Sequence, residues 1–223
     1  MADTHQAAYA SVELTREEVF NRMMSVFEAH QIGFTHSVNG LCWDDSFAEF
    51  YYHLDPEKKN IKNLRDAWKI SSQWMGVGFD FRFSQWDFEL YLFTQNQRES
   101  VVLSFPHSLY KTATIDGGIA SKWVRLLADI GLCLGKTAMI CGPEVRILSA
   151  EGEELFAQFQ HSLKNYRRGD YFIHTVLFPR LLFKKLIPGQ QLPETFFISK
   201  VVDDYQVATG VVRPLIGTFF NES

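Results

Sequence analysis

The stretch from residue 78 to residue 106, GFDFRFSQWDFELYLFTQNQRESVVLSFP, constrains the fold more than any other part of the chain. Apolar side chains occupy every second position in three successive runs, which is the pattern of half-buried β-strands. The runs are Phe79, Phe81 and Phe83, then Trp86, Phe88, Leu90 and Leu92, then Val101, Leu103 and Phe105. The stretch therefore predicts a three-stranded antiparallel meander.

The loops between these runs predict how the strands pair. A two-residue loop at Ser84-Gln85 places Phe83 opposite Trp86, and the same register pairs 81 with 88 and 79 with 90. A four-residue loop from Gln95 to Arg98 pairs 92 with 101, 90 with 103 and 88 with 105. Both loop lengths put the large apolar residues on one face of the sheet, so they predict the same register independently.

Two amphipathic helices are predicted to pack beside this sheet. Thr15 and Glu18 form a capping box ahead of a stripe of apolar residues, and Gly33 stands where a C-terminal stop is expected. A second helix begins after Asp116 and ends at Gly135. Its apolar stripe is the largest in the chain, so we expect this helix to cover the aromatic face. The stripe consists of Ile119, Trp123, Leu126, Leu127, Ile130 and Leu134.

The rest of the chain contributes weaker patterns. Asn39-Gly40 predicts a tight hairpin between residues 34–38 and 41–43, and Asp55-Pro56 predicts a helix start that runs to Trp68. Short strands are expected at 137–141, 145–148 and 171–178, a helix after Ser149, and a last hairpin from 196–202 to 206–212 around Asp203. Residues 1–13 are expected to be a mobile leader. The prediction is one α+β domain over residues 1–223, an antiparallel β-meander sheet with amphipathic helices packed on one aromatic-rich face.

Composition narrows the class of protein. The formal net charge is −4, and residues 1–106 hold 15 of the 26 acidic but only 9 of the 22 basic residues, so the first half is acidic. The N-terminus has no basic and apolar signal-peptide pattern, and no apolar run is long enough to span a bilayer. Three cysteines without a C-x-x-C pair indicate a reducing compartment. These features predict a soluble, cytoplasmic protein.

Motif searches give little sign of an enzyme. Gly135-Lys136-Thr137 lacks the earlier glycine of a phosphate-binding loop and ends a helix instead of opening one. The start of the helix at Asp116-Gly117-Gly118 could bind an anion, but the Asp116 carboxylate would occupy the same backbone donors. The seven histidines have no zinc-ligand spacing, and no serine or cysteine has a nucleophile motif. We predict no cofactor and no metal site.

The meander register produces one local conflict, on the face opposite the aromatic core. It places Arg82 across from Asp87, which is a complementary pair, but Asp80 across from Glu89, which is a repulsive one. The two carboxylates could extend into water, accept a basic partner or a cation, or share a proton as a catalytic acid and base. Farther along this face Tyr91, Phe93 and Val102 would be exposed, which is typical of a protein-binding surface.

Three function classes remain open. The leading hypothesis is a non-enzymatic protein-binding inhibitor of the immunity type, which neutralises a basic toxin or nuclease by contact. The predicted partner-binding residues are Asp80, Arg82, Asp87, Glu89, Tyr91, Phe93, Asp44, Asp45 and Glu49. The alternative is a small-molecule hydrolase that uses Asp80, Glu89 and His107 at the edge of the sheet. The third class binds nucleic acid or an anionic membrane through the basic stretch from Lys164 to Lys185.

Overall fold

A computed structural model gives the arrangement of the chain. It describes residues 4–43, 50–51, 64–71, 76–95, 97–142, 157, 175–186, 196–198 and 205–210. The strands are β1 (Thr4–Tyr9), β2 (Gly33–Trp43), β3 (Phe50–Tyr51), β4 (Gly76–Phe83), β5 (Trp86–Gln95), β6 (Arg98–Pro106), β7 (Met139–Gly142), β8 (Thr175–Pro179), β9 (Phe196–Ile198) and β10 (Tyr205–Gly210). The helices are α1 (Arg16–Ala29), α2 (Leu64–Ser71), α3 (His107–Ala113), α4 (Gly117–Cys133) and α6 (Arg180–Leu186).

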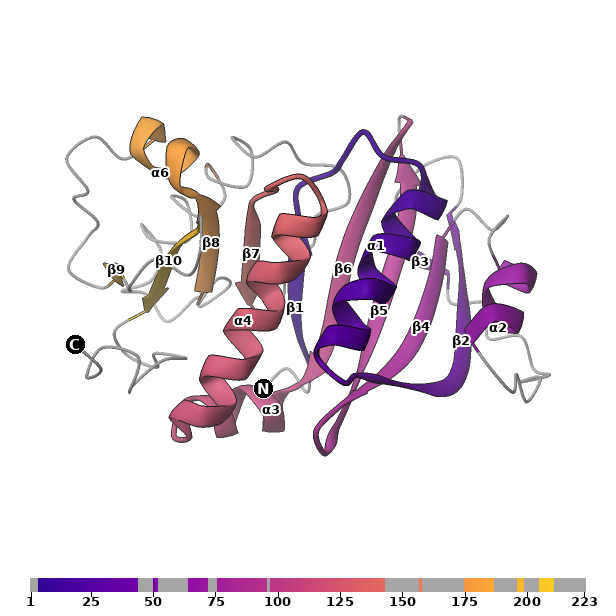
Figure 1. Ribbon diagram of the computed structural model, residues 1–223, viewed down its shortest axis with the longest axis horizontal. Helices are drawn as coiled ribbons and strands as arrows, with labels where there is room; N and C mark the ends of the chain where they lie inside the picture. Colours follow the sequence, from indigo (N-terminus) through magenta and orange to yellow (C-terminus); the bar gives the residue numbers. More distant parts are fainter. Residues whose placement is uncertain are drawn as a thin grey trace.

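The strands form one antiparallel sheet in the order β3-β2-β4-β5-β6-β1-β7-β8-β10-β9 (Figure 1). The N-terminal strand β1 lies in its interior, because it pairs with β6 on one side and with β7 on the other. The expectation of a mobile leader is therefore wrong for the described residues from Thr4 on, which form β1 and continue into backbone hydrogen bonds at Ala10 and Val12. Alternate residues of β1 point to the two faces of the sheet, and both faces are closed here, since Ala7, Ala8 and Tyr9 are all buried.

The predicted meander is confirmed as β4, β5 and β6, and so is its register. Phe83 pairs with Trp86, Phe79 with Leu90, and Leu92 with Val101. The ladder between β5 and β6 continues to Gln95 and Arg98, so the second loop is two residues long and not four. Tight hairpin turns require positive φ angles, which glycine usually provides. Here Ser84 and Gln97 provide them, with φ angles of 55° and 62°.

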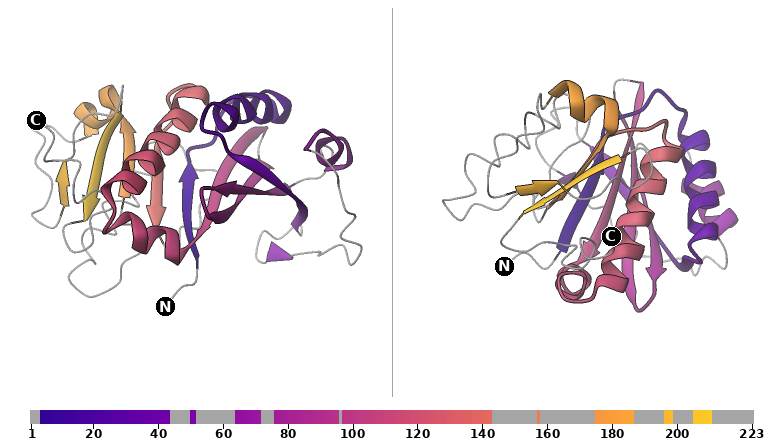
Figure 2. Two further views of the ribbon diagram at one scale, coloured as in Figure 1. Left: turned by 60° about the horizontal axis from the view of Figure 1, so that its bottom comes forward. Right: turned by 60° about the vertical axis from the view of Figure 1, so that its left-hand side comes forward.

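The helices α1 and α4 lie side by side on one face of the sheet (Figures 1 and 2). Helix α1 begins at the predicted capping box, in which the backbone N–H of Glu18 donates to Thr15 and the N–H of Thr15 donates to the Glu18 carboxylate. The buried side of α1 packs on β4 and β5, with Phe27 edge-on to Phe81 and to Phe88. The helix ends at Ala29, four residues before Gly33, which instead begins β2.

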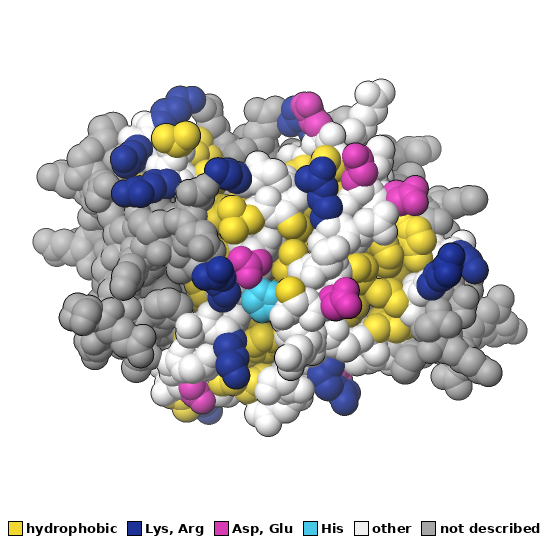
Figure 3. All heavy atoms as spheres, viewed as in Figure 1, with side chains coloured by type: hydrophobic (Ala, Val, Ile, Leu, Met, Phe, Trp, Pro, Cys, Tyr) yellow, Lys and Arg dark blue, Asp and Glu magenta, His cyan; other side chains and the backbone are white. Residues whose placement is uncertain are grey.

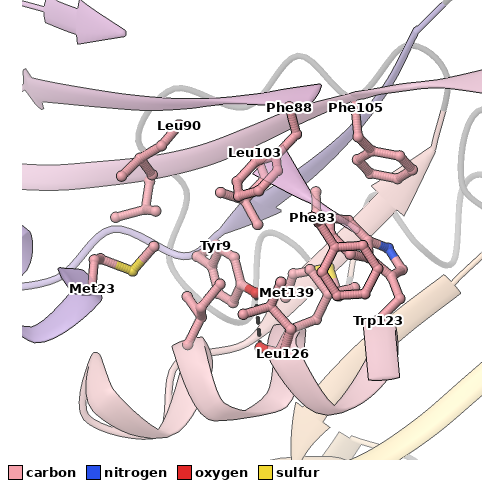
Figure 4. Packing of buried hydrophobic residues seen from close by; sticks show 14 of the residues in the cluster. Tyr9, Met23, Phe83, Phe88, Leu90, Leu103, Phe105, Trp123, Leu126 and Met139 are labelled. Atoms are coloured by element: carbon pink, nitrogen blue, oxygen red, sulfur yellow. Dashed lines mark hydrogen bonds between the residues drawn. The ribbon is translucent and has the colours of Figure 1, made fainter. Parts of the chain in front are cut away.

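Helix α4 covers the other part of the same face, as its stripe predicted. Trp123 lies edge-on to Phe83, Phe88 and Phe105 with ring centroids 4.9 to 6.0 Å apart. The hydroxyl of Tyr9 on β1 donates a 2.8 Å hydrogen bond to the Leu127 carbonyl of α4 (Figure 4). We call this side the helix face. Helices α1 and α4 share this aromatic face, which confirms the predicted packing of amphipathic helices on one aromatic-rich face of the sheet.

The hairpin predicted at Asn39-Gly40 is wrong, because these residues lie inside β2. Asn39-Gly40 does not turn the chain, because β2 runs without interruption from Gly33 to Trp43 and pairs Asn39 with Gly78. Of the helix predicted from Asp55 to Trp68, the described part is α2, which begins at Leu64. The last hairpin is confirmed as β9 and β10, and the strand predicted at 171–178 appears as β8. The strand at 145–148 and the helix after Ser149 lie outside the described residues.

Candidate functional site: the carboxylate pair on the sheet

A row of polar residues crosses the face of the sheet opposite α1 and α4. Asp80 on β4 pairs with Glu89 on β5, Glu89 with Ser104 on β6, and Ser104 with Gln6 on β1. Directly paired residues of antiparallel strands point to the same side, so the four side chains share one face. We call Asp80, Glu89, Ser104 and Gln6 the polar row. The prediction that Asp80 and Glu89 oppose each other is confirmed.

The two carboxylates of the polar row have different surroundings. Glu89 accepts a hydrogen bond from the hydroxyl of Tyr91, two residues along the same strand face. Asp80 has no equivalent donor, because its buried Oδ1 atom accepts no hydrogen bond in the described part of the chain. A buried carboxylate oxygen without a donor costs about 1 to 3 kcal/mol or more, and Oδ1 of Asp80 is such an atom.

The neighbouring arginine does not compensate Asp80. Arg82 is the next residue of β4 on this face, but its Nε and Nη2 atoms donate to the two carboxylate oxygens of Asp87, at 2.7 and 3.1 Å. This bidentate pair is the complementary one that the register predicted. Its side chains are 57% and 58% exposed, and the pair lies beside the Ser84-Gln85 turn between β4 and β5. Both of these donors of Arg82 are therefore directed at Asp87 and not at Asp80.

The apolar end of this face is not a surface, which corrects the expectation of exposed aromatic residues. Tyr91 and Phe93 are only 5% and 4% exposed and stack on each other, and Val102 is buried as well. Both faces of β5 and β6 are therefore closed at this end, so these three side chains cannot meet a partner in this conformation. The other predicted partner-binding residues, Asp44, Asp45 and Glu49, lie outside the described residues.

The structure does not bring His107 to the carboxylates. His5 pairs with Phe105 on the helix face, whereas Glu89 pairs with Ser104 on the other face. The Nε2 atom of His5 lies 2.9 Å from Nδ1 of His107, and the His5 ring also stacks on Tyr110. His107 is therefore held in a histidine and tyrosine cluster on the side away from Asp80 and Glu89. The three residues of the hydrolase hypothesis do not form one site.

The cysteines and the start of helix α4 do not form a second reactive or anion-binding site in the described chain. Burial raises the pKa of Cys133 to about 12 and that of Cys141 further, so neither thiol is a nucleophile at neutral pH. The Asp116 carboxylate accepts from the N–H groups of Gly118 and Ile119, which occupies the helix start that was considered as an anion site. Within the described ranges, no group of three histidine, cysteine or carboxylate side chains is placed to hold a metal ion.

Two residues and two contacts of these sites were not predicted from the sequence. Gln6 and His5 were assigned to a leader, although His5, Ala7 and Tyr9 alternate with shorter or polar residues as a strand would. The hydrogen bond from Tyr91 to Glu89 follows from their i, i+2 spacing on one strand face, and the register alone could have predicted it. The unsatisfied state of Asp80 depends on side-chain conformations that no sequence pattern specifies.

Comparison with known proteins does not add a family. No protein-family model matches the chain, and a search of the curated proteins finds no similar sequence. No helix in the described part of the chain has the length and hydropathy that a bilayer crossing requires. The polar row is therefore the feature of the described chain that points most directly to a function.

Proposed function

We propose that this chain is a non-enzymatic, cytoplasmic protein-binding protein that receives a basic group of its partner between Asp80 and Glu89. The observation that carries the proposal is the buried Oδ1 of Asp80, which has no donor and faces a second carboxylate. A lysine or arginine side chain from a partner would supply the donor that Oδ1 of Asp80 lacks. Natural proteins keep such local conflicts mainly where they serve a function.

The acidic first half of the chain supports a basic partner. Residues 1–106 carry an excess of acidic side chains, and long-range attraction speeds the encounter with a positively charged surface. The specific version that we propose is an immunity-type inhibitor, which would cover the basic active site of a toxin or nuclease. No cofactor enters this function. The hydrolase alternative keeps the opposed carboxylates but loses its histidine, because His107 is hydrogen-bonded to His5 on the helix face.

A pull-down with three matched baits tests the proposal. The baits are the wild-type chain, the double variant Asp80→Asn/Glu89→Gln, and a control double variant, Glu17→Gln/Glu28→Gln, which loses the same charge from exposed positions of α1. We expect one host protein to bind the wild-type and control baits at low salt, to be released by moderate salt, and to be lost from the Asp80/Glu89 variant. A partner that binds all three baits equally would contradict the assigned site.

A further inference from the structure

Helix α6 carries an exposed apolar residue among positive charges. Leu181 is 84% exposed, and its neighbours Arg180, Lys184 and Lys185 are exposed as well. Phe183, which is 1% exposed, anchors the opposite side of the helix in the interior. We call Arg180, Leu181, Lys184 and Lys185 the α6 patch. Residues 181, 184 and 185 lie on one side of a helix by their i, i+3 and i+4 spacing, so the apolar and basic groups are adjacent.

The α6 patch has no acidic member and projects from the molecule. Helix α6 contains no aspartate or glutamate, and it follows β8 at one end of the sheet (Figure 1). In the space-filling view, basic side chains surround a hydrophobic group at this end of the molecule (Figure 3). Leu181 is almost fully exposed on α6, so a partner must accommodate its side chain. A lipid headgroup layer does so, whereas a folded protein needs a matching pocket.

We propose that the α6 patch binds peripherally to an anionic phospholipid surface. The side chain of Leu181 would enter the headgroup layer, and Arg180, Lys184 and Lys185 would contact lipid phosphates and carboxylates. This surface is separate from the polar row, so the inference does not depend on the proposed protein partner. One apolar side chain and three cations give weak and reversible binding, which salt reverses.

The same chain contains a natural comparison site. Ile115 is the other exposed large apolar residue of the described chain, at 80%, and Lys111 and Lys122 near it in sequence are exposed. It differs from Leu181 in that the exposed Asp116 follows it directly, and an anionic surface repels that carboxylate. A substitution of Ile115 therefore controls for the loss of an exposed apolar side chain. Substitution of Lys111 and Lys122 controls for the loss of two positive charges.

Vesicle sedimentation tests the inference. The probes are vesicles of phosphatidylcholine alone and vesicles with about one third phosphatidylserine, at low salt. We expect the wild-type chain to bind the anionic vesicles about tenfold or more better than the neutral ones. Leu181→Ser and Arg180→Gln/Lys184→Gln should each reduce this binding about fivefold or more, whereas Ile115→Ser and Lys111→Gln/Lys122→Gln should leave it unchanged. The substituted side chains are exposed, and circular dichroism checks that each variant is folded.

Two outcomes would overturn the inference. Equal losses in the α6 and Ile115 variants would mean that binding reflects general charge and not the α6 patch. Absence of binding to anionic vesicles, together with α6-dependent retention on DNA-cellulose or on polyglutamate, would assign the patch to a nucleic acid or to an acidic protein instead.

Discussion

At the scale of single residues, burial shifts the pKa of His5 and so makes the stability of the fold depend on pH. His5 is 4% exposed, and its pKa is lowered to about 4, first by burial and then by the neighbouring His107. The unfolded chain has a histidine pKa of about 6.5, so it binds more protons than the folded chain between pH 6.5 and pH 4. The stability that the low pKa of His5 contributes is therefore fully present above pH 6.5. It is lost as the pH falls toward 4.

The first prediction concerns this loss. We expect the free energy of unfolding to fall by on the order of 2 to 3 kcal/mol between pH 7 and pH 4 because of His5, since each pKa unit corresponds to about 1.4 kcal/mol. Urea unfolding at a series of pH values measures it. The variant His5→Gln should lack this part of the pH dependence while keeping the part that carboxylates contribute. Identical pH profiles of the two proteins would show that His5 does not titrate in this range.

A second residue-scale prediction compares a buried ion pair with an exposed one. Arg16 lies 2.8 Å from the buried carboxylate of Glu99, whose other oxygen accepts from Thr94. Burial raises the pKa of Glu99 even with Arg16 beside it. We expect Arg16→Met to lower the free energy of unfolding by about 3 kcal/mol, because it leaves a buried carboxylate without its cation.

The exposed pair provides the control for this comparison. Arg82→Met breaks the bidentate contact with Asp87, in which both side chains are more than half exposed, and should cost less than about 1 kcal/mol. Chemical denaturation of both variants gives the difference. Equal losses would mean that burial does not set the strength of these pairs.

At the scale of elements, helix α4 packs closely against β10 because Gly131 has no side chain. A methyl group on Gly131 would lie 2.5 Å from the hydroxyl of Tyr205 on β10, and that hydroxyl donates to the Thr137 carbonyl. An exposed helical glycine replaced by alanine usually gains about 1 kcal/mol. Here we expect Gly131→Ala to lower the unfolding midpoint and to weaken hydrogen-exchange protection of β10 first. Gly33→Ala, where an added methyl meets no atom within 4 Å, should leave both unchanged.

The elements also show which sequence signals were sufficient. The capping box of Thr15 and Glu18 predicted the start of α1, and alternation predicted the register of the meander, because both are set within a few residues. Asn39-Gly40 misled because its turn preference is weaker than the pairing of β2 with β4, a contact between residues far apart in the sequence. The polar row could be predicted only as far as Glu89 and Ser104, since Gln6 enters it from the N-terminus.

At the scale of the whole molecule, β1 joins the two parts of the sheet. It is the strand between β6 and β7, and its Tyr9 is bonded to α4. We predict that deletion of residues 1–9 abolishes cooperative unfolding, because it removes two ladders and exposes the core between them. A truncated chain with a wild-type urea transition would contradict the central place of β1.

The central claim is that Asp80, whose buried Oδ1 atom accepts no hydrogen bond in the described chain, is held opposite Glu89 for binding and not for stability. The most direct measurement is the free energy of unfolding of Asp80→Asn at neutral pH, compared with Asp87→Asn. We predict that Asp80→Asn is more stable than the wild type by about 1 kcal/mol, because the repulsion is removed, while Asp87→Asn loses up to about 1 kcal/mol with its ion pair. A less stable Asp80→Asn variant would mean that the carboxylate stabilises the fold, and the claim would be wrong.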